Sequence, residues 1–278
     1  MNNNKIVVIS PFYNPNEFLS NSIKSVLTQN YDNFDYVMVD DCSNEKTKEV
    51  IRSFFELEFL EEKIGVTGKV FRKYKCTSKN ETKAKNVFLL ERLERCKIIA
   101  NWTDATMEFC EKDDILCSLD GDDWFYKKDV LSFYDNLFNE EKCWISYGGT
   151  TWTDGRKCCS APYTEQDFVN LRKVRQFKVS QMRVYKAGLF QKIIELDNEL
   201  FSFKNEKGEF YESACDVALI YPMLEMAGKD RVYHNTKKIN YVYNRSNPIN
   251  NDKVNQKLQW DNHAQILTKN AWNKIENY

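Results

Sequence analysis

A short apolar run that ends in a cluster of acids constrains this chain more than any other stretch. Residues 115–119 (ILCSL) are followed by residues 120–123 (DGDD), which hold three carboxylates within four positions. A run this short is typical of a buried strand, and unpaired acids cannot remain buried, so the chain has to reach the surface where the acids begin. We therefore expect a charged cluster at the end of a central strand.

The acids of this cluster have the chemistry of a divalent metal site. In an open α/β sheet, ligands lie in the crevice outside the carboxyl ends of the strands. The carboxylates of Asp120 and Asp122 are hard ligands that suit an ion which also holds phosphate oxygens, and Gly121 between them allows backbone or ligand to approach closely. The alternative is a solvated acidic turn in which Asp123 caps the next helix. The cluster alone leaves both interpretations open.

Two earlier segments repeat the pattern of an apolar strand that ends at a loop. Residues 5–10 form a β-branched run closed by Pro11, and residues 34–39 form a second run that ends in Asp40 and Asp41. Each run precedes a stretch with helical spacing of apolar residues, so strand and helix alternate. This alternation predicts an α/β fold with a mostly parallel central sheet flanked by helices.

Residues 63–85 have a different character, because they are basic and poor in aliphatic side chains. We expect a surface excursion here, with one edge strand at residues 70–71. It is either a solvated loop or a flexible flap that meets an anionic substrate. Residues 87–90 suggest a third strand, but a helix over residues 81–95 is an equally good interpretation, since periodicity does not decide between them.

The second half of the chain contains a further acid at a helix start. Asp216 precedes an apolar helix, and such an acid is commonly explained by the positive end of the helix dipole. Apolar spacing predicts helices at residues 98–110, 128–138, 186–194 and 217–226 and near 258–267, and strands at residues 143–147, 180–185 and 238–243.

Composition limits the class of protein. The 40 basic and 41 acidic residues leave a net charge of -1, so no global field favours nucleic acid or a membrane surface. The nine cysteines lack the spacing of a zinc site, and several lie in apolar runs, which favours a reducing cytoplasmic location. No stretch approaches the roughly 20 apolar residues that a transmembrane helix needs, and the start of the chain is too short for a signal peptide.

Three separated signatures make the chain resemble the family 2 glycosyltransferases, which are inverting, nucleotide-sugar-dependent enzymes with the GT-A fold. The signatures are residues 9–14 (ISPFYN) with 25–31 (SVLTQNY), residues 36–43 (YVMVDDCS) followed by Thr47, and residues 119–124 (LDGDDW), which look like the family's DxD element. Residues 182–190, 216–228 and 241–248 are similar to a branch of stand-alone enzymes from bacteria and giant viruses.

The resemblance implies a single GT-A domain over residues 1–278. Residues 1–125 would form the half that binds the nucleotide sugar, and residues 126–250 the acceptor and catalytic half. Residues 251–278 would form a C-terminal helical tail.

The resemblance also implies roles for individual residues. Asp216 matches the position of the general base, although Cys215 precedes it where the family often has glutamate. Asp122 would hold the metal and Asp120 would face the ribose, with Asp123 as the alternative for either. The remaining implied positions are Pro11, Tyr13 and Asp41 at the nucleotide base, Lys97 and Asn101 near the ribose and phosphates, Gly121 in the DxD turn and Asp252 as a further metal ligand, for which a turn-forming acid is the alternative. The guanidinium of Arg183 is suited either to bidentate pairing with a phosphate or to a structural ion pair.

The activity implied by the resemblance is the metal-dependent transfer of a hexose from a UDP-sugar, such as UDP-glucose, to an acceptor hydroxyl with inversion. The acceptor would be a glycan, a protein or a small molecule, and the metal Mn²⁺ or Mg²⁺. Two other functions stay open. One is a phosphohydrolase of the haloacid dehalogenase type, in which Asp120 would be the nucleophile. The other is a module that binds a nucleotide sugar without catalysis.

Overall fold

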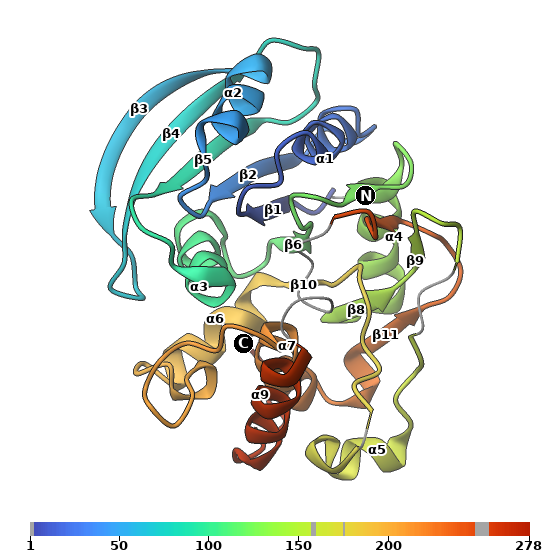
Figure 1. The fold of residues 1–278 in the computed structure, drawn as a ribbon. Helices are drawn as coiled ribbons and strands as arrows, with labels where there is room; N and C mark the ends of the chain where they lie inside the picture. Colours follow the sequence, from blue (N-terminus) through green and yellow to red (C-terminus); the bar gives the residue numbers. More distant parts are fainter. Residues whose placement is uncertain (1–2, 157–159, 175, 248–255) are drawn as a thin grey trace.

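A nine-stranded sheet forms the centre of the computed structural model, which describes residues 3–156, 160–174, 176–247 and 256–278 (Figure 1). Its strands are β1 (Ile6–Phe12), β2 (Phe34–Asp40), β3 (Phe55–Ile64), β4 (Val70–Ser78), β5 (Asn86–Arg92), β6 (Ile115–Ser118), β8 (Ile145–Gly148), β10 (Val184–Lys186) and β11 (Val232–Asn235). They lie in the order β11-β8-β10-β6-β1-β2-β5-β4-β3. The predicted parallel sheet is confirmed at its centre, where β6, β1, β2 and β5 are parallel neighbours.

Helices cover both faces of this sheet, so the molecule has three layers (Figure 1). One face packs on α1 (Phe18–Leu27), α2 (Glu45–Phe54) and α4 (Val130–Glu141), and the other on α3 (Lys97–Phe109), α6 (Ala187–Leu196) and α7 (Cys215–Ala227). Successive side chains of a strand point to opposite faces, so the β-branched run of β1 supplies both cores at once: Val7 and Ile9 face one, Ile6 and Val8 the other. The helix α9 (Gln256–Thr268) packs on α7, and the short helix α5 (Glu165–Val169) lies apart from the sheet.

The first strand continues two residues beyond the expected end. Pro11 does not close β1, because the strand pairs with β2 as far as Phe12. On its other side β1 pairs with β6 only as far as Ile9. Pro11 therefore stands where one neighbouring strand has already ended, and a proline is tolerated at such an edge.

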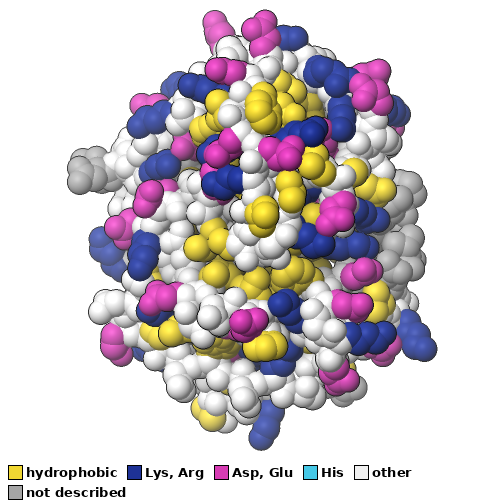
Figure 2. Space-filling view, turned by 90° about the vertical axis from the view of Figure 1, so that its left-hand side faces the viewer, with side chains coloured by type: hydrophobic (Ala, Val, Ile, Leu, Met, Phe, Trp, Pro, Cys, Tyr) yellow, Lys and Arg dark blue, Asp and Glu magenta, His cyan; other side chains and the backbone are white. Residues whose placement is uncertain are grey.

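The basic stretch at residues 63–85 is not a surface excursion, and this expectation was wrong. Together β3 and β4 form a long antiparallel hairpin that extends the sheet beyond β5, and residues 86–92 are a strand rather than part of a helix. The strand β3 lies at the edge of the sheet, and most of its side chains are exposed. Figure 2 shows this side of the molecule, where hydrophobic side chains lie among acidic and basic ones.

A second, three-stranded sheet brings the end of the chain back to the acidic cluster. It consists of β7 (Trp124–Phe125), β12 (Tyr241–Tyr243) and β9 (Thr150–Trp152), in that order. The expected strand at residues 238–243 is thus present in part, but its partners β7 and β9 are short and were not predicted. Because β7 follows the acids directly, this pairing places residues 241–247 beside them.

Candidate active site

The three acids of residues 120–123 lie beyond the carboxyl end of β6, as the sequence predicts, but each has different surroundings. Asp123 is fully buried. Its carboxylate accepts hydrogen bonds from the Tyr241 hydroxyl at 2.6 Å and from the Asn244 backbone N–H at 2.7 Å. Burial, together with the neighbouring acids, raises its pKa well above the usual range. Asp123 is therefore a structural tie between this turn and β12, and neither a metal ligand nor a helix cap, since α4 begins only at Val130.

The other two acids keep part of their surface exposed. The side-chain amide of Gln181 donates to Asp120 Oδ2 at 2.8 Å, and that of Asn247 donates to Asp122 Oδ2 at 2.6 Å. Burial raises the pKa of both carboxyls, and that of Asp120 reaches about 6. These two carboxylates are the ones available to a ligand at this edge of the sheet.

Glycine at position 121 is required by packing. A Cβ placed there would lie 2.4 Å from the Phe12 Cβ. The Gly121 N–H also donates to the Pro11 carbonyl at 3.2 Å. The end of β1 thus packs closely against Gly121, and this contact holds the loop after β1 against the acidic turn.

Asp216 and Asp120 line one small pocket, although they are 96 positions apart in the sequence. Asp216 is the second residue of α7, so its predicted place at a helix start is confirmed. Its side chain is 31% exposed, and Arg183 lies beside it with a guanidinium nitrogen 3.4 Å from Oδ2. The structure therefore brings together Asp120, Arg183 and Asp216, three of the residues predicted to form the site.

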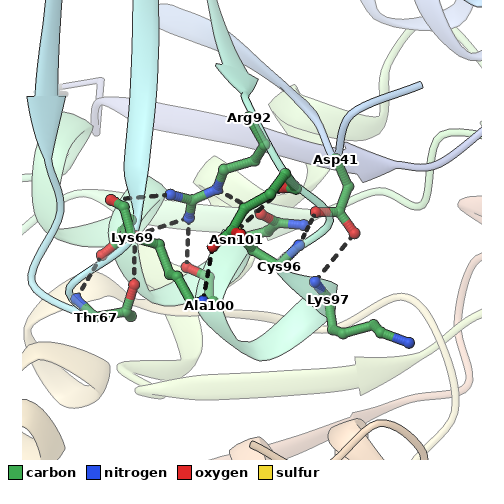
Figure 3. A network of polar contacts seen from close by, with 10 residues as sticks. Asp41, Thr67, Lys69, Arg92, Cys96, Lys97, Ala100 and Asn101 are labelled. Atoms are coloured by element: carbon green, nitrogen blue, oxygen red, sulfur yellow. Dashed lines mark hydrogen bonds and ion pairs between the residues drawn. The ribbon is translucent and has the colours of Figure 1, made fainter. Parts of the chain in front are cut away.

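Asp41 lies at the end of β2 and fixes the start of α3. Its two carboxylate oxygens accept hydrogen bonds from the backbone N–H groups of Cys96, at 2.6 Å, and Lys97, at 3.1 Å (Figure 3). A carboxylate oxygen has two lone pairs, so each can accept one further bond. The ammonium of Lys97 points to the other half of the molecule and lies 3.3 Å from Glu212.

Tyr13 lies beside this carboxylate on the loop after β1. Its ring is half-buried, and the guanidinium carbon of Arg95 lies 3.8 Å from the ring centroid. The Nε of Arg95 is 3.9 Å from Asp41 Oδ2. An aromatic ring, a guanidinium and a carboxylate thus form one cluster, whereas Pro11 is buried within β1.

Asn101 does not belong to this cluster, and its implied contact with the ribose or phosphates does not agree with its position. The side chain is only 1% exposed, and Oδ1 accepts a hydrogen bond from Arg92 Nε at 2.8 Å (Figure 3). Arg92 also pairs at 2.8 Å with Asp104, which in turn accepts from the backbone and hydroxyl of Thr67 in the β3–β4 turn. Asn101 is therefore part of a buried network that fastens the hairpin to α3.

Several residues of the site were missed by sequence reasoning. Gln181, Tyr241 and Asn247 contact the acids from segments more than 50 positions away. Gln181 carries no local signal, and Tyr241 and Asn247 lie in residues 241–248, whose similarity to the stand-alone branch implied no role for either residue. The pairing of β10 with β6 and of β12 with β7 brings these segments near the acids. Arg95 likewise carries no signal beyond its charge.

The donor set for a metal is small within the described residues. No group of three or more His, Cys, Asp or Glu side chains there is arranged to hold an ion. Such a site suits Mg²⁺ or Mn²⁺ held by one or two carboxylates together with substrate phosphates and water. Asp122 fits this role, and Asp252 lies outside the described residues.

Within the part of the chain that the structure describes, none of the helices is both long and apolar enough to cross a bilayer. The seven cysteines in these ranges are free thiols, and six of the seven are buried.

Comparison with known proteins gives a sequence match and a wider structural match. Residues 7–81 match the model of glycosyl transferase family 2. TuaG of Bacillus subtilis (strain 168), which is named as a glycosyltransferase of teichuronic acid biosynthesis, is 29% identical over 66 residues. That alignment covers 22% of this chain and 26% of TuaG, so the match spans about a quarter of the relative's length.

The structural matches extend over most of the chain. S. aureus TarS 1-349 superposes with a TM-score of 0.58 at 17% identity, covering 86% of this chain and 60% of that one. Crystal structures of the same fragment contain UDP or UDP-GlcNAc. Mannosyltransferase PcManGT from Pyrobaculum calidifontis, in complex with GDP-Man and Mn²⁺, matches with a TM-score of 0.53 at 15% identity, covering 87% and 57%. At these identities the likeness concerns the fold. Residues 7–81 are thus similar to glycosyl transferase family 2, and the architecture of most of the chain is the GT-A fold of the matched glycosyltransferase structures.

Proposed function

We propose that this protein transfers a hexose from a UDP-sugar to an acceptor hydroxyl, with inversion and with Mn²⁺ or Mg²⁺. The observation that carries the proposal is the shared pocket of Asp120 and Asp216. One acid follows a central strand of the nucleotide half and the other begins a helix of the second half. An inverting transferase needs this arrangement, because the leaving group and the general base act on opposite faces of the sugar.

The cluster of Tyr13, Arg95 and Asp41 supports the choice of nucleotide. A carboxylate can accept the ring N–H of uracil, and the tyrosine ring and guanidinium offer flat surfaces for stacking on a base. The solved TarS structures with UDP and UDP-GlcNAc show that this fold accommodates a uridine nucleotide in another protein. We assign UDP on these grounds and assign the phosphates to the neighbourhood of Lys97 and Arg183.

Asp122 is the residue that we assign to the metal. A divalent ion bound there would offset the negative charge that develops on the departing nucleoside diphosphate. The carboxylate is held by Asn247 and shares its turn with Asp120, so both acids are positioned before any ligand arrives. Gln181 contributes by fixing the orientation of Asp120.

Asp216 is the proposed general base. Its exposed oxygen can take the proton of an acceptor hydroxyl while the sugar carbon is attacked. The guanidinium of Arg183 lies 3.4 Å from the Asp216 carboxylate and helps to orient it. The acceptor itself is a glycan, a protein hydroxyl or a small molecule.

The hydrolase alternative loses its support because the matched family and the fold are those of glycosyltransferases. The alternative of a binding module without catalysis differs from our proposal only in turnover. Release of UDP from a UDP-sugar, with and without an acceptor hydroxyl, distinguishes the two.

Calorimetry of UDP binding with and without Mn²⁺ tests the proposed site. We expect metal-dependent binding that Asp122→Ala weakens by about tenfold or more, in line with the loss of a charged contact. Asp113→Ala is the matched control, because this exposed acid precedes the opposite end of β6. Equal binding by the wild type and Asp122→Ala would contradict the metal assignment, and absence of UDP binding would contradict the proposed function.

A further inference from the structure

Lys97 lies between the two parts of the proposed donor site. Its backbone N–H donates at 3.1 Å to the carboxylate of Asp41, the group that we assign to the uracil base. The next residue, Ile98, lines the pocket that contains Asp120 and Asp216, where we place the reacting sugar. A diphosphate that joins the base to the sugar therefore has to pass close to this lysine.

The ammonium of Lys97 is paired with an acid from the second half of the chain. Its Nζ lies 3.3 Å from Oε2 of Glu212, and its side chain extends away from Asp41 (Figure 3). Among the described residues, no other acid lies within ion-pair distance of this ammonium. Glu212 stands on the loop that leads into α7 and to Asp216. One ion pair thus joins the start of α3 to the segment that carries the proposed base.

This ion pair is weak enough to be exchanged for another. The side chains of Lys97 and Glu212 are 32% and 57% exposed, and water screens ion pairs with this exposure. A diphosphate carries more than one negative charge and offers several oxygens, so it attracts an ammonium more strongly than a single carboxylate does. Because the lysine has a flexible stem, its ammonium can turn to the phosphates while its backbone stays bound to Asp41.

We propose that Glu212 is a positioning residue for Lys97 and that it competes with the donor diphosphate for the lysine ammonium. This inference rests on the proposed function, because it takes the diphosphate to lie at Lys97. When the donor binds, the lysine exchanges Glu212 for the phosphates, and when UDP leaves, the lysine returns to Glu212. Glu212 therefore weakens UDP binding and favours the release of this product.

Calorimetry of UDP binding in the presence of Mn²⁺ tests the exchange with a cycle of variants. Glu212→Gln removes the competing charge, and we expect it to bind UDP about two- to fivefold more tightly than the wild type, as the strength of an exposed ion pair implies. Lys97→Met should weaken UDP binding by about tenfold. The double variant Glu212→Gln/Lys97→Met should bind UDP as weakly as Lys97→Met alone.

Glu206→Gln is the matched control, because it removes the same charge from an exposed position of the same loop. It should bind UDP as the wild type does, which separates local competition for the lysine from a general change in net charge. At high salt the gain in Glu212→Gln should shrink, because screening already weakens the ion pair in the wild type.

Equal UDP binding by Glu212→Gln and the wild type would overturn the exchange. A gain of the same size with and without Lys97 would also overturn it, because Glu212 would then act on UDP without the lysine. Both results leave UDP binding by the wild type, and with it the proposed function, intact. Absence of UDP binding by the wild type would overturn both.

Discussion

A guanidinium nitrogen of Arg183 lies 3.4 Å from Oδ2 of Asp216, at the first turn of α7. The pair joins the residue that we assign to proton transfer with a cation that lines the same pocket. A change at Asp216 therefore tests catalysis, and UDP affinity measured on the same variant tests donor binding separately.

Asp216→Asn should abolish transfer and keep donor binding. The amide preserves the shape of the side chain but cannot take a proton, so we expect the transfer rate to fall by about 10²–10⁴. UDP affinity, measured by calorimetry, should change little because Asp216 does not contact the nucleotide in our assignment. A variant that binds the donor and retains most of the transfer rate would exclude Asp216 as the base.

Asp123→Ala should destabilise the protein, because it removes the carboxylate that accepts hydrogen bonds from two buried donors. These are the Tyr241 hydroxyl and the Asn244 N–H, and an unsatisfied buried donor costs about 1–3 kcal/mol. Asp123→Asn keeps one acceptor and should lose less. The measurement is urea denaturation of both variants. Equal stability of the wild type and Asp123→Ala would show that the tie to β12 has no structural role.

Breaking the buried ion pair of Arg92 and Asp104 should lower the free energy of unfolding more than breaking an exposed ion pair. Arg92→Leu leaves a carboxylate buried without its partner, and we expect a loss of about 3–5 kcal/mol in the free energy of unfolding. Arg92→Leu combined with Asp104→Leu should cost less than the sum of the single changes. Lys46→Ala removes the exposed pair with Glu17 and should leave the free energy of unfolding almost unchanged, because solvent screens that pair. Additive losses at Arg92 and Asp104 would contradict the coupling.

Asp120 should make the unliganded protein less stable as the pH rises from about 4 to about 6. Burial raises its pKa in the folded protein to about 6, whereas the unfolded value is about 3.9. Between these two pKa values the folded state binds the proton more firmly than the unfolded state does. Protonation of Asp120 therefore stabilises the folded protein fully below the unfolded pKa, and this contribution is lost as the pH rises through the folded pKa. In urea denaturation at several pH values, Asp120→Asn should gain stability relative to the wild type across this window. A constant difference between the two proteins would contradict the raised pKa.

The central part of the fold was predictable because a short apolar run in the sequence is recognisable as a buried strand. The strands β1, β2 and β6 are buried runs that end at loops or acids, and α1, α2 and α3 follow from apolar spacing. The positions of the candidate residues Asp120, Asp122 and Asp216 in the fold could be predicted because each stands at the boundary of such an element.

The parts that were missed depend on contacts between distant segments. The edge strand β3 is an exception, because residues 55–59 (FELEF) alternate apolar and charged side chains, and this local strand signal was overlooked. Asn101 has the sequence position of a ligand residue but is turned inward by Arg92. The role of Gln181 depends on the pairing of β10 with β6, which no local rule predicts.

The three neighbouring carboxylates in the turn from Asp120 to Asp123 have three different surroundings: Asp120 lines a pocket, Asp122 accepts a hydrogen bond from the Asn247 amide, and Asp123 is buried in the core. Position along the turn decides which acid goes where, since the side chains themselves are identical. A deletion or insertion of one residue would turn the core acid toward solvent and a surface acid toward the core. Among natural variants of this chain, insertions or deletions within this turn should therefore be rarer than substitutions of the neighbouring Trp124.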